Sequence, residues 1–434
     1  MTHVERHRDR ILKITLGITK GALRLVVMLS LVVVASRPTQ AQLNTLYTFS
    51  GGADGGRPQA RVIDDAAGNM WGTTLWGGNL TCNAGNGCGV VYRLTPTGKE
   101  TVVHRFAGGT DGAYPSAALT IAQGKLYGTT TNGGSSGCFS NGCGTLFQID
   151  ATGKETVLYR FTGGSDGGEP SSALTVDTSG KLFGATSIGG NLNCGAPYGC
   201  GVVYEYDPMT GKFTALWTFP GGASGAYPEV DSLALDPFGN IYGTTYAGGD
   251  ANCNCGVVFR LDTTGKETVV YTFLGGTDGS FPASGVIVDA KSKALYGTTP
   301  AGGANGKGTL FKITTSGYST LYNFGGASDG VTPLGGVKVC SDGSIFGSTS
   351  GGGSLGYGTL FKLDNTGKES VIYDFDYSFS GAVPVSSFGW THDGAGNMTQ
   401  RGTASEGGNV NGQNGSGTVY EETYPGANML CKAQ

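Results

Sequence analysis

Acidic side chains that recur at one spacing are the first candidates for chemistry in this chain. Five of them stand four residues before a proline: Asp54, Asp111, Asp166, Asp278 and Asp329. Carboxylates gathered around one opening would bind a cation or the hydroxyl groups of a sugar. Asp-Gly is also common turn chemistry, because the carboxylate accepts hydrogen bonds from the nearby backbone. Ser224 and Ser380 take the same position in two further copies and keep the turn-forming character without the charge, so we favour the turn role.

Aromatic side chains near these turns form a second candidate set. Trp76 lies in a polar loop whose six counterparts hold no aromatic residue. An exposed ring can stack on a sugar, although packing against a neighbouring residue is the commoner role. Tyr114, Tyr227 and Phe281 directly precede prolines and would either extend such a surface or fill its rim.

Eight of the ten cysteines form close pairs, which predicts loop disulfides in an exported protein. The pairs are Cys82 with Cys88, Cys138 with Cys143, Cys194 with Cys200, and Cys253 with Cys255. The last pair is the doubtful one, because a single intervening residue strains the bridge. A zinc site is less favoured, since only His104 and His392 lie beyond the first forty residues and closed zinc sites gather four ligands locally.

No catalytic set can be assembled from the pattern. There is no nucleophile with a histidine base and an orienting acid, and no Gly-Gly loop is followed by the lysine and helix of a phosphate-binding loop. We therefore predict no catalytic residues and no cofactor. A formal net charge of −4 leaves no basic field for nucleic acid, and 80 glycines disfavour helix.

The elements that must position these residues follow from an internal repeat of roughly 51 to 58 residues. Seven prolines in one register mark its copies: Pro58, Pro115, Pro170, Pro228, Pro282, Pro333 and Pro384. Each copy carries four strand-like segments of five to seven residues joined by glycine turns, for example 155–161, 173–177, 181–186 and 201–206 in the third copy. Four short antiparallel strands per copy predict an all-β, seven-bladed β-propeller.

The order of the segments also predicts how the ring closes. The strand type that ends in phenylalanine occurs first at residues 43–49, and the type written Gly-Thr-Leu-Phe or Gly-Val-Val-Tyr occurs last at 417–420. We expect residues 43–49 to pair with 416–422 and complete the seventh blade, which removes the open edges of the ring. An open β-solenoid is the alternative, but it would use shorter repeats and dedicated caps.

The first forty-one residues differ from the rest. Six basic residues between Arg6 and Arg24 precede an apolar run from Leu25 to Ala35, and Thr39-Gln40-Ala41 fits a cleavage site. This order predicts a signal peptide over 1–41, with an uncleaved membrane anchor as the alternative. The propeller is then expected over 42–424, followed by a tail, 425–434, without an apolar span.

The repeat motifs resemble a known family. Asp-x-x-Gly-x-Leu-Tyr-Gly-Thr-Thr-x-x-Gly-Gly, seen near 177–190 and 236–249, occurs with Gly-Thr-Leu-Phe-Lys and Thr-Gly-Lys-Glu-Thr. Together they are similar to the GloVer tandem repeat of bacterial exported proteins, over residues 43 to about 422. The resemblance implies an exported, often surface-associated bacterial protein with varying C-terminal anchors and no established activity. It transfers no catalytic residues, and the tail of this chain favours simple secretion.

These observations predict an extracellular binding or scaffold module, monomeric, with a glycan or protein ligand and no nucleic acid or membrane span after cleavage. A secreted carbohydrate-active or lactone-hydrolysing enzyme is the alternative, on fold analogy alone. Strand direction places the Asp-Gly and cysteine loops on one face, here called the upper face, and the Asp-x-x-Gly and Thr-Gly-Lys turns on the lower face. We expect ligand on the upper face over blades one to four. Cys340 and Cys431 are expected to bond near the lower face and hold the tail there.

Overall fold

The computed structural model describes residues 42–138, 141–228, 231–326, 328–384, 389–392, 398–410 and 413–424. The chain divides after Ala41 into two units, and the predicted signal peptide lies outside the described residues. Within the described residues, no helix is long and apolar enough to cross a membrane. The second unit begins at Gln42 and contains all of the described residues.

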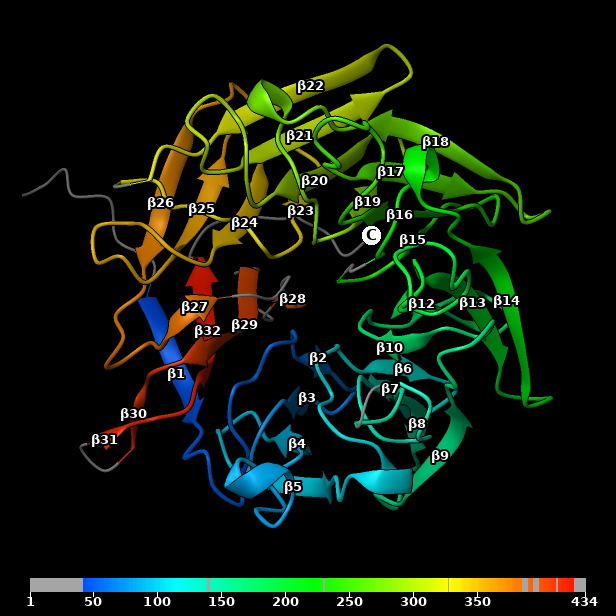
Figure 1. The fold of residues 1–434 in the computed structure, drawn as a ribbon. Coiled ribbons are helices and arrows are strands. Elements are labelled where there is room, and N and C mark those ends of the chain that lie inside the picture. Colours follow the sequence, from blue (N-terminus) through cyan, green and yellow to red (C-terminus); the bar gives the residue numbers. More distant parts are fainter. Residues whose placement is uncertain are drawn as a thin grey trace, which may run out of the picture. The chain divides into compact units, whose positions relative to one another are not determined.

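Seven antiparallel four-stranded sheets surround one axis, so the predicted seven-bladed β-propeller is confirmed (Figure 1). From the axis outward, blade 1 is β2 (Ile63–Asp64), β3 (Met70–Thr74), β4 (Val90–Leu94) and β5 (Glu100–Arg105); blade 2 is β6 (Thr120–Ala122), β7 (Lys125–Thr130), β8 (Thr145–Ile149) and β9 (Glu155–Arg160). Blade 3 is β10 (Gly168–Pro170) with β11 (Thr175–Val176), then β12 (Leu182–Ile188), β13 (Val202–Asp207) and β14 (Lys212–Thr218). Blade 4 is β15 (Ala234–Leu235), β16 (Ile241–Thr245), β17 (Val257–Leu261) and β18 (Glu267–Thr272).

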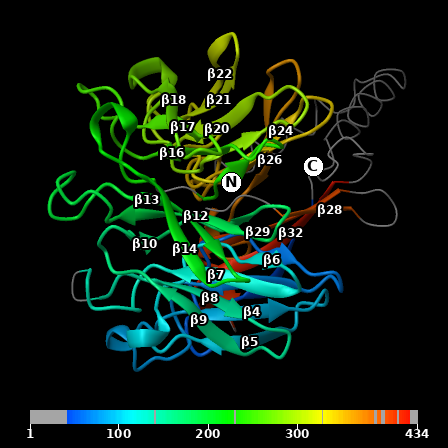
Figure 2. The ribbon, with the colours of Figure 1, turned by 90° about the vertical axis from the view of Figure 1, so that its right-hand side faces the viewer.

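Blade 5 is β19 (Val286–Val288), β20 (Leu295–Thr299), β21 (Thr309–Thr314) and β22 (Gly317–Asn323); blade 6 is β23 (Lys338–Val339), β24 (Ile345–Thr349), β25 (Thr359–Leu363) and β26 (Glu369–Asp374). Blade 7 is β27 (Ala382–Pro384) with β28 (Gly389–His392), then β29 (Met398–Glu406), β32 (Thr418–Tyr424) and β1 (Gln42–Thr48). A small hairpin, β30 (Asn409–Val410) and β31 (Gln413–Asn414), and four 3-10 turns, η1 (Asn83–Gly85), η2 (Gly109–Asp111), η3 (Gly222–Ser224) and η4 (Gly276–Asp278), complete the described elements. Figure 2 shows blades 1 and 2 across the ring from blades 4 and 5.

The ring closes as the sequence predicts. β1 pairs antiparallel with β32, from Gln42 opposite Thr423 to Thr48 opposite Thr418. In Figure 1 the first described strand lies beside the last one. The outer strand of blade 7 is therefore supplied by the start of the propeller, and each of the seven sheets has four layers of strand.

One phenylalanine per blade anchors the core. Phe49, Phe106, Phe161, Phe219, Phe273, Phe324 and Phe375 end the outer strands and are all fully buried. Burying such a ring contributes about 2–3 kcal/mol each. The third strands are buried at four of their first five positions, as in Val90–Leu94, because sheet neighbours and adjacent blades cover both faces. Thr73, Thr244 and Thr298 donate hydroxyl hydrogen bonds to backbone carbonyls just before the inner strand of the next blade, and these bonds link adjacent blades.

Each blade contacts the next through one glycine and one proline. A Cβ built on the glycine that opens the third strand would lie 2.5 to 2.9 Å from Cδ of the next blade's proline. The seven pairs are Gly89 with Pro115, Gly144 with Pro170, Gly201 with Pro228, Gly256 with Pro282, Gly308 with Pro333, Gly358 with Pro384, and Gly417 with Pro58. These glycines also have φ between +91° and +103°, which other residues rarely adopt.

A backbone hydrogen bond accompanies every glycine–proline contact. The residue before each proline donates its N–H to the carbonyl of the residue before the glycine, at 2.7 to 3.0 Å; Arg57 donates to Ser416 in this way, and Tyr227 to Cys200. The donor residue has positive φ in all seven copies. Such backbone strain costs about 1–3 kcal/mol and persists where the surrounding structure imposes it. The glycine–proline contact therefore sets the spacing between blades.

We predict that Gly201→Ala lowers the free energy of unfolding by about 3 kcal/mol or more, through positive φ and the clash with Pro228. Gly306→Ala is the matched control, because its φ is +68° and nothing lies within 4 Å of the new Cβ. The control should cost about 1 kcal/mol. Denaturant unfolding of both variants decides the matter, and equal losses would contradict the proposed role of the contact.

A second prediction concerns closure. Removing residues 42–49 deletes β1 and Phe49 and exposes an edge of β32. The whole ring should then melt at a markedly lower temperature than a chain that starts at Gln42. A melting temperature within a degree or two of that control, with the same oligomeric state, would show that closure does not depend on β1.

Candidate functional site

The five predicted aspartates lie at separate boundaries between blades. Each accepts a hydrogen bond from the side chain two residues before the phenylalanine of its own outer strand: Tyr47 to Asp54 (3.1 Å), His104 to Asp111 (3.3 Å), Tyr159 to Asp166 (3.0 Å), Tyr271 to Asp278 (2.8 Å) and Tyr322 to Asp329 (2.7 Å). Each also accepts a backbone N–H from its own loop, as from Ser50 or Thr162. These carboxylates stabilise the turns that follow the outer strands. They therefore lie at the outer side of the blades and do not gather around the mouth of the channel.

A residue at the start of the next blade's outer strand completes each boundary. It is a glutamate facing Asp54, Asp111 and Asp329, where burial, with a further contribution from the aspartate, raises the pKa of Glu100, Glu155 and Glu369 to about 7. At two other boundaries it is an aromatic ring: Phe213 stacks on Tyr159 and Tyr318 on Tyr271, with centroids 4.3 and 4.2 Å apart. The same position of the outer strand thus contacts the preceding blade through a carboxyl group at some boundaries and through an aromatic ring at others.

Among the described residues, one group of side chains has the composition of a metal site. His104, Asp111 and Glu155 meet at the boundary between blades 1 and 2, with their ligand atoms within 4.8 Å of one another. Sequence reasoning missed this group, because His104 was considered only as a partner for cysteines. The available signal was a histidine at a position where the other six copies hold tyrosine or tryptophan.

The predicted aromatic residues each have contacts of their own within the protein. The guanidinium of Arg57 lies 4.4 Å from the ring centroid of Trp76, so one face of that ring is covered. Phe281 stacks on Tyr246 at 5.1 Å. Tyr114 and Tyr227 each donate a backbone N–H to the preceding blade. Packing accounts for these contacts of the loop aromatics.

All four predicted loop disulfides are bonded in the structure: Cys82–Cys88, Cys138–Cys143, Cys194–Cys200 and Cys253–Cys255. The doubtful pair, Cys253 with Cys255, is therefore included. Each disulfide lies beside a glycine near the start of the loop that precedes the next blade's proline: Gly108, Gly163, Gly221 and Gly275. Cys340 is disulfide-bonded, while Cys431 lies outside the described residues, so their pairing stays a prediction.

Three cavities lie on or near the turns predicted for the lower face. One, of about 550 Å³, is lined by the innermost strands of blades 1 to 4, including Arg61, Thr120 and Thr175. A second, the blade 1–2 cavity, measures about 470 Å³, and an equivalent one of about 510 Å³ lies between blades 3 and 4. Asp64 and Ile121 line both the first and the second cavity. Ligand-sized space therefore adjoins the face opposite to the one predicted.

The blade 1–2 cavity combines one large ring with charged groups. Its lining includes Trp71, Arg93, Asp65, Lys125 and Asp150. The Arg93 guanidinium lies 5.7 Å from the centroid of Trp71, whose indole Nε1 donates to Asp65 Oδ2 at 2.9 Å. The ring is thus held by polar contacts while it lines the cavity, which is the arrangement found in sites for amphipathic ligands.

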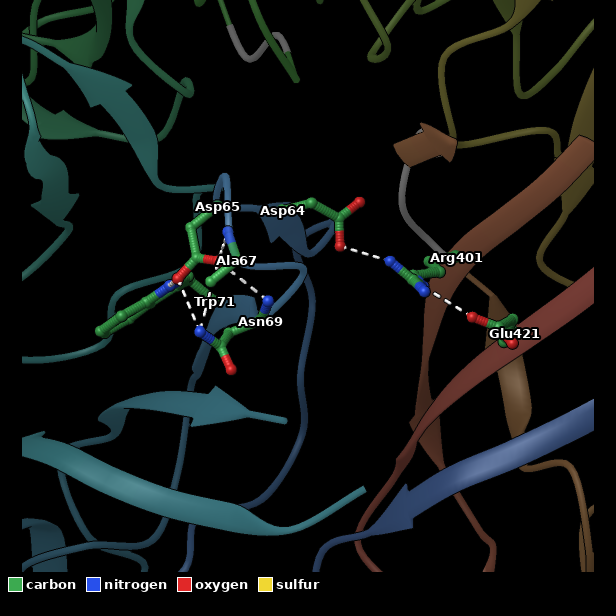
Figure 3. Close-up of polar contacts among 7 residues, drawn as sticks. All are labelled: Asp64, Asp65, Ala67, Asn69, Trp71, Arg401 and Glu421. Carbon is green, nitrogen blue, oxygen red and sulfur yellow. Dashed lines mark hydrogen bonds and ion pairs between the residues drawn. The ribbon is translucent and has the colours of Figure 1, made fainter. Parts of the chain in front are cut away.

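Asp65 and Asp64 are adjacent in sequence but lie in different environments (Figure 3). Burial opposes ionisation of Asp65, yet hydrogen bonds from Trp71, Asn69 and Ala67 outweigh it and hold the pKa of that carboxyl below its ordinary value. Burial raises the pKa of Asp64, and Arg401 only partly opposes the rise. Two of the three carboxyl groups that line the cavity, Asp64 and Asp65, therefore have pKa shifts of opposite direction.

Arg401 joins blade 7 to blade 1. Its Nη1 lies 2.6 Å from Asp64 Oδ1, its Nε lies 2.7 Å from Glu421 Oε2, and all three side chains are less than a quarter exposed. In every blade, one residue of the second strand pairs with the same position of the third strand. In blade 7 this residue is Arg401, whereas in the other blades it is aromatic, for example Trp71 in blade 1 and Phe346 in blade 6. Asp64 replaces the valine, leucine or isoleucine of blades 2 to 6. This ion network, which lies at the closing boundary, was missed from the sequence.

Comparison with protein families identifies the repeat. The model of the Gloeobacter/Verrucomicrobia repeat matches residues 32–198 and 193–420. The chain belongs to this family. The resemblance inferred from the Asp-x-x-Gly and Gly-Thr-Leu-Phe motifs is thus confirmed. The comparison with curated proteins found no match.

Two solved structures with TM-scores above 0.5 share the fold of this repeat protein. The extracellular domain of a putative one-component system from B. thetaiotaomicron is 11% identical, with a TM-score of 0.57 over 89% of this chain and 40% of that one. A second structure is the extracellular domain of a putative hybrid two-component system from B. thetaiotaomicron. It is 12% identical, with a TM-score of 0.56 over 88% of this chain and 40% of that one. A gluconolactonase from Xanthomonas campestris is 12% identical, with a TM-score of 0.42 over 91% and 92%. The chain spans two-fifths of the length of the first two, and at such identities the likeness concerns the fold alone.

The raised pKa values of Glu100 and Glu369 give a prediction with a definite sign. These groups bind protons more tightly in the folded chain than at their ordinary pKa of 4.5, so stability falls as pH rises from about 4.5 through about 7. The double variant Glu100→Gln, Glu369→Gln should match the unmodified chain at pH 4.5 and be more stable at pH 8. The gain should not exceed about 1 kcal/mol per site, because solvent screens these half-exposed groups. Identical unfolding curves at pH 8 would contradict it.

Proposed function

We propose that this chain is an exported binding module and that a glycan is its ligand, held in the blade 1–2 cavity. This keeps the class of function predicted from the sequence and moves the contact surface from the upper face to the lower one. The observation that carries the proposal is the cavity of about 470 Å³ that places Trp71 among Asp65, Arg93 and Lys125.

The lining suits a sugar better than a purely apolar or purely charged ligand. An indole face packs on the C–H groups of a sugar ring, and nearby carboxylates and cations hydrogen-bond its hydroxyls. Lys125, which lines the cavity, donates to Gln148 at 3.3 Å. Ile121, Leu126 and Ile149 supply the apolar part of the wall.

The disulfides support export. Four bonded pairs lie in surface loops of blades 1 to 4, and such bridges form and persist in oxidising compartments. Together with the basic and apolar residues that precede Gln42, they support secretion after cleavage of a signal peptide. Outside the cell, a rigid propeller with a preorganised cavity suits recognition of glycans.

A glycan array with the exported chain tests the proposal. Trp71→Ala should weaken binding of any retained glycan at least tenfold, about 1.4 kcal/mol, and Arg93→Gln, which installs the residue that blade 2 carries at this position, should weaken it without unfolding. Trp76→Ala, on the upper face, is the matched control and should bind normally. Loss of binding in Trp76→Ala with Asp111→Asn and Asp166→Asn, but not in Trp71→Ala, would move the site to the upper face. Binding of proteins but no glycans would overturn the ligand class.

Hydrolysis is a second candidate function, and the pair Asp64 and Asp65 favours it. Enzymes that use two carboxyl groups separate their pKa values, one held as an acid and the other ionised. The shifts of Asp64 and Asp65 have opposite directions in one cavity. Breakdown of an arrayed glycan or a lactone that is lost in Asp64→Asn would favour the enzyme over the binding module.

A further inference from the structure

We propose that His104, Asp111 and Glu155 form a site for a divalent transition-metal ion at the boundary between blades 1 and 2. His104 lies on the outer strand β5 of blade 1, Asp111 ends the turn η2 that follows, and Glu155 begins the outer strand β9 of blade 2. An ion held by all three would join the two blades on the outer side of the ring. The site is separate from the blade 1–2 cavity, whose lining includes none of these residues.

The distances suit one ion. The ligand atoms lie within 4.8 Å of one another. Nitrogen and carboxylate oxygen each bind zinc at about 2.0–2.2 Å, so two donors at a tetrahedral angle lie about 3.3–3.6 Å apart. Donor atoms at the widest separation would close by about 1.2–1.5 Å through side-chain rotation.

Glu155 offers an unpartnered carboxylate oxygen, as Glu100 and Glu369 do at their boundaries, within the described residues. Glu155 Oε1 is buried and has no hydrogen-bond partner within the part of the chain that the structure describes. Asp111 is oriented by the Ala107 N–H, which donates to Oδ2 at 2.7 Å, while Oδ1 lies 3.3 Å from His104 Nε2. His104 Nε2 therefore points at the carboxylate, and once its proton is displaced this nitrogen would present a lone pair to an ion placed between them.

The other boundaries isolate the contribution of the histidine. Asp54 with Glu100 and Asp329 with Glu369 repeat the acidic pair, but there the third side chain is Tyr47 or Tyr322. A tyrosine donates its hydroxyl to the aspartate and completes a structural contact. Imidazole nitrogen with carboxylate oxygen is a donor set suited to zinc, cobalt or manganese rather than to calcium. The substitution therefore converts one copy of a repeated boundary into a metal-binding group.

Arg160 is the charged neighbour that opposes an ion. It interacts electrostatically with both Asp111 and Glu155, and its Nε donates to the Thr110 carbonyl at 3.2 Å. With both carboxylates ionised and Arg160 charged, the group carries a net charge of about −1 and still attracts a divalent cation. Three protein donors leave one position for water, as in open zinc sites.

The test titrates the full chain, freed of metal with a chelator, with Zn²⁺ by calorimetry and with Co²⁺ by visible absorption. One ion per chain is expected, with cobalt bands in the visible range and a higher melting temperature in the presence of Zn²⁺. His104→Tyr restores the residue of five other boundaries, so it should fold normally, and it should lower the affinity at least tenfold. Glu155→Gln should do the same, and Arg160→Gln should tighten binding.

A histidine elsewhere serves as the control. His392→Gln removes the other histidine that follows residue 41 and should leave the cobalt spectrum and the stoichiometry unchanged. Equal affinity in His104→Tyr, or loss of binding in His392→Gln instead, would overturn the proposal. So would the absence of any saturable binding to a folded chain.

Discussion

The contact between a glycine and the next blade's proline is the constraint on which the rest of this propeller depends. It occurs seven times, and the accompanying N–H to carbonyl bond links each pair of neighbouring blades through the backbone. Because neither partner is a variable side chain, the spacing of the blades is set independently of the local composition. The strained residue before each proline and the positive φ of each glycine are the conformational cost of this geometry.

Once the backbone sets the spacing, the outer side chains of the boundaries are free to differ. A glutamate faces an aspartate at three boundaries, aromatic rings stack at two, and Leu43 and Tyr373 pack on the same core cluster where blade 6 meets blade 7. The closing boundary adds Arg401 between Asp64 and Glu421. Because the described inner strands of blades 2 to 6 carry apolar residues at the position of Asp64, this charged pair favours pairing of the last blade with the first, and a misplaced Arg401 would lie against an apolar residue.

The sequence predicted what depends on repetition. The proline register, the turn glycines and the phenylalanine strands specified the number of blades, and the strand order specified closure. The cavities were not predictable, because Trp71 and Lys125 come together through the twist of two sheets and not through any spacing along the chain. Asp64 and Arg401 are 337 residues apart in sequence. Departures from the repeat were the signal that could have revealed these groups. Arg401 and His104 each occupy a position that is aromatic in the other blades. Arg401 forms the ion network of the closing boundary, and His104 lies with Asp111 and Glu155.

The origin of blade 7 in both ends of the propeller also dictates an order of events. β1 is the first strand of the propeller to be made, yet its partner β32 is among the last. A chain that emerges from its N-terminus can complete blades 1 to 6 in turn, while β1 waits with an unpaired edge until more than 350 residues have followed. Contacts between residues so far apart in sequence form slowly. Until they form, the unpaired edge of β1 is exposed and can pair with another chain. Assembly of this ring is thus tied to the rate at which the whole chain is delivered.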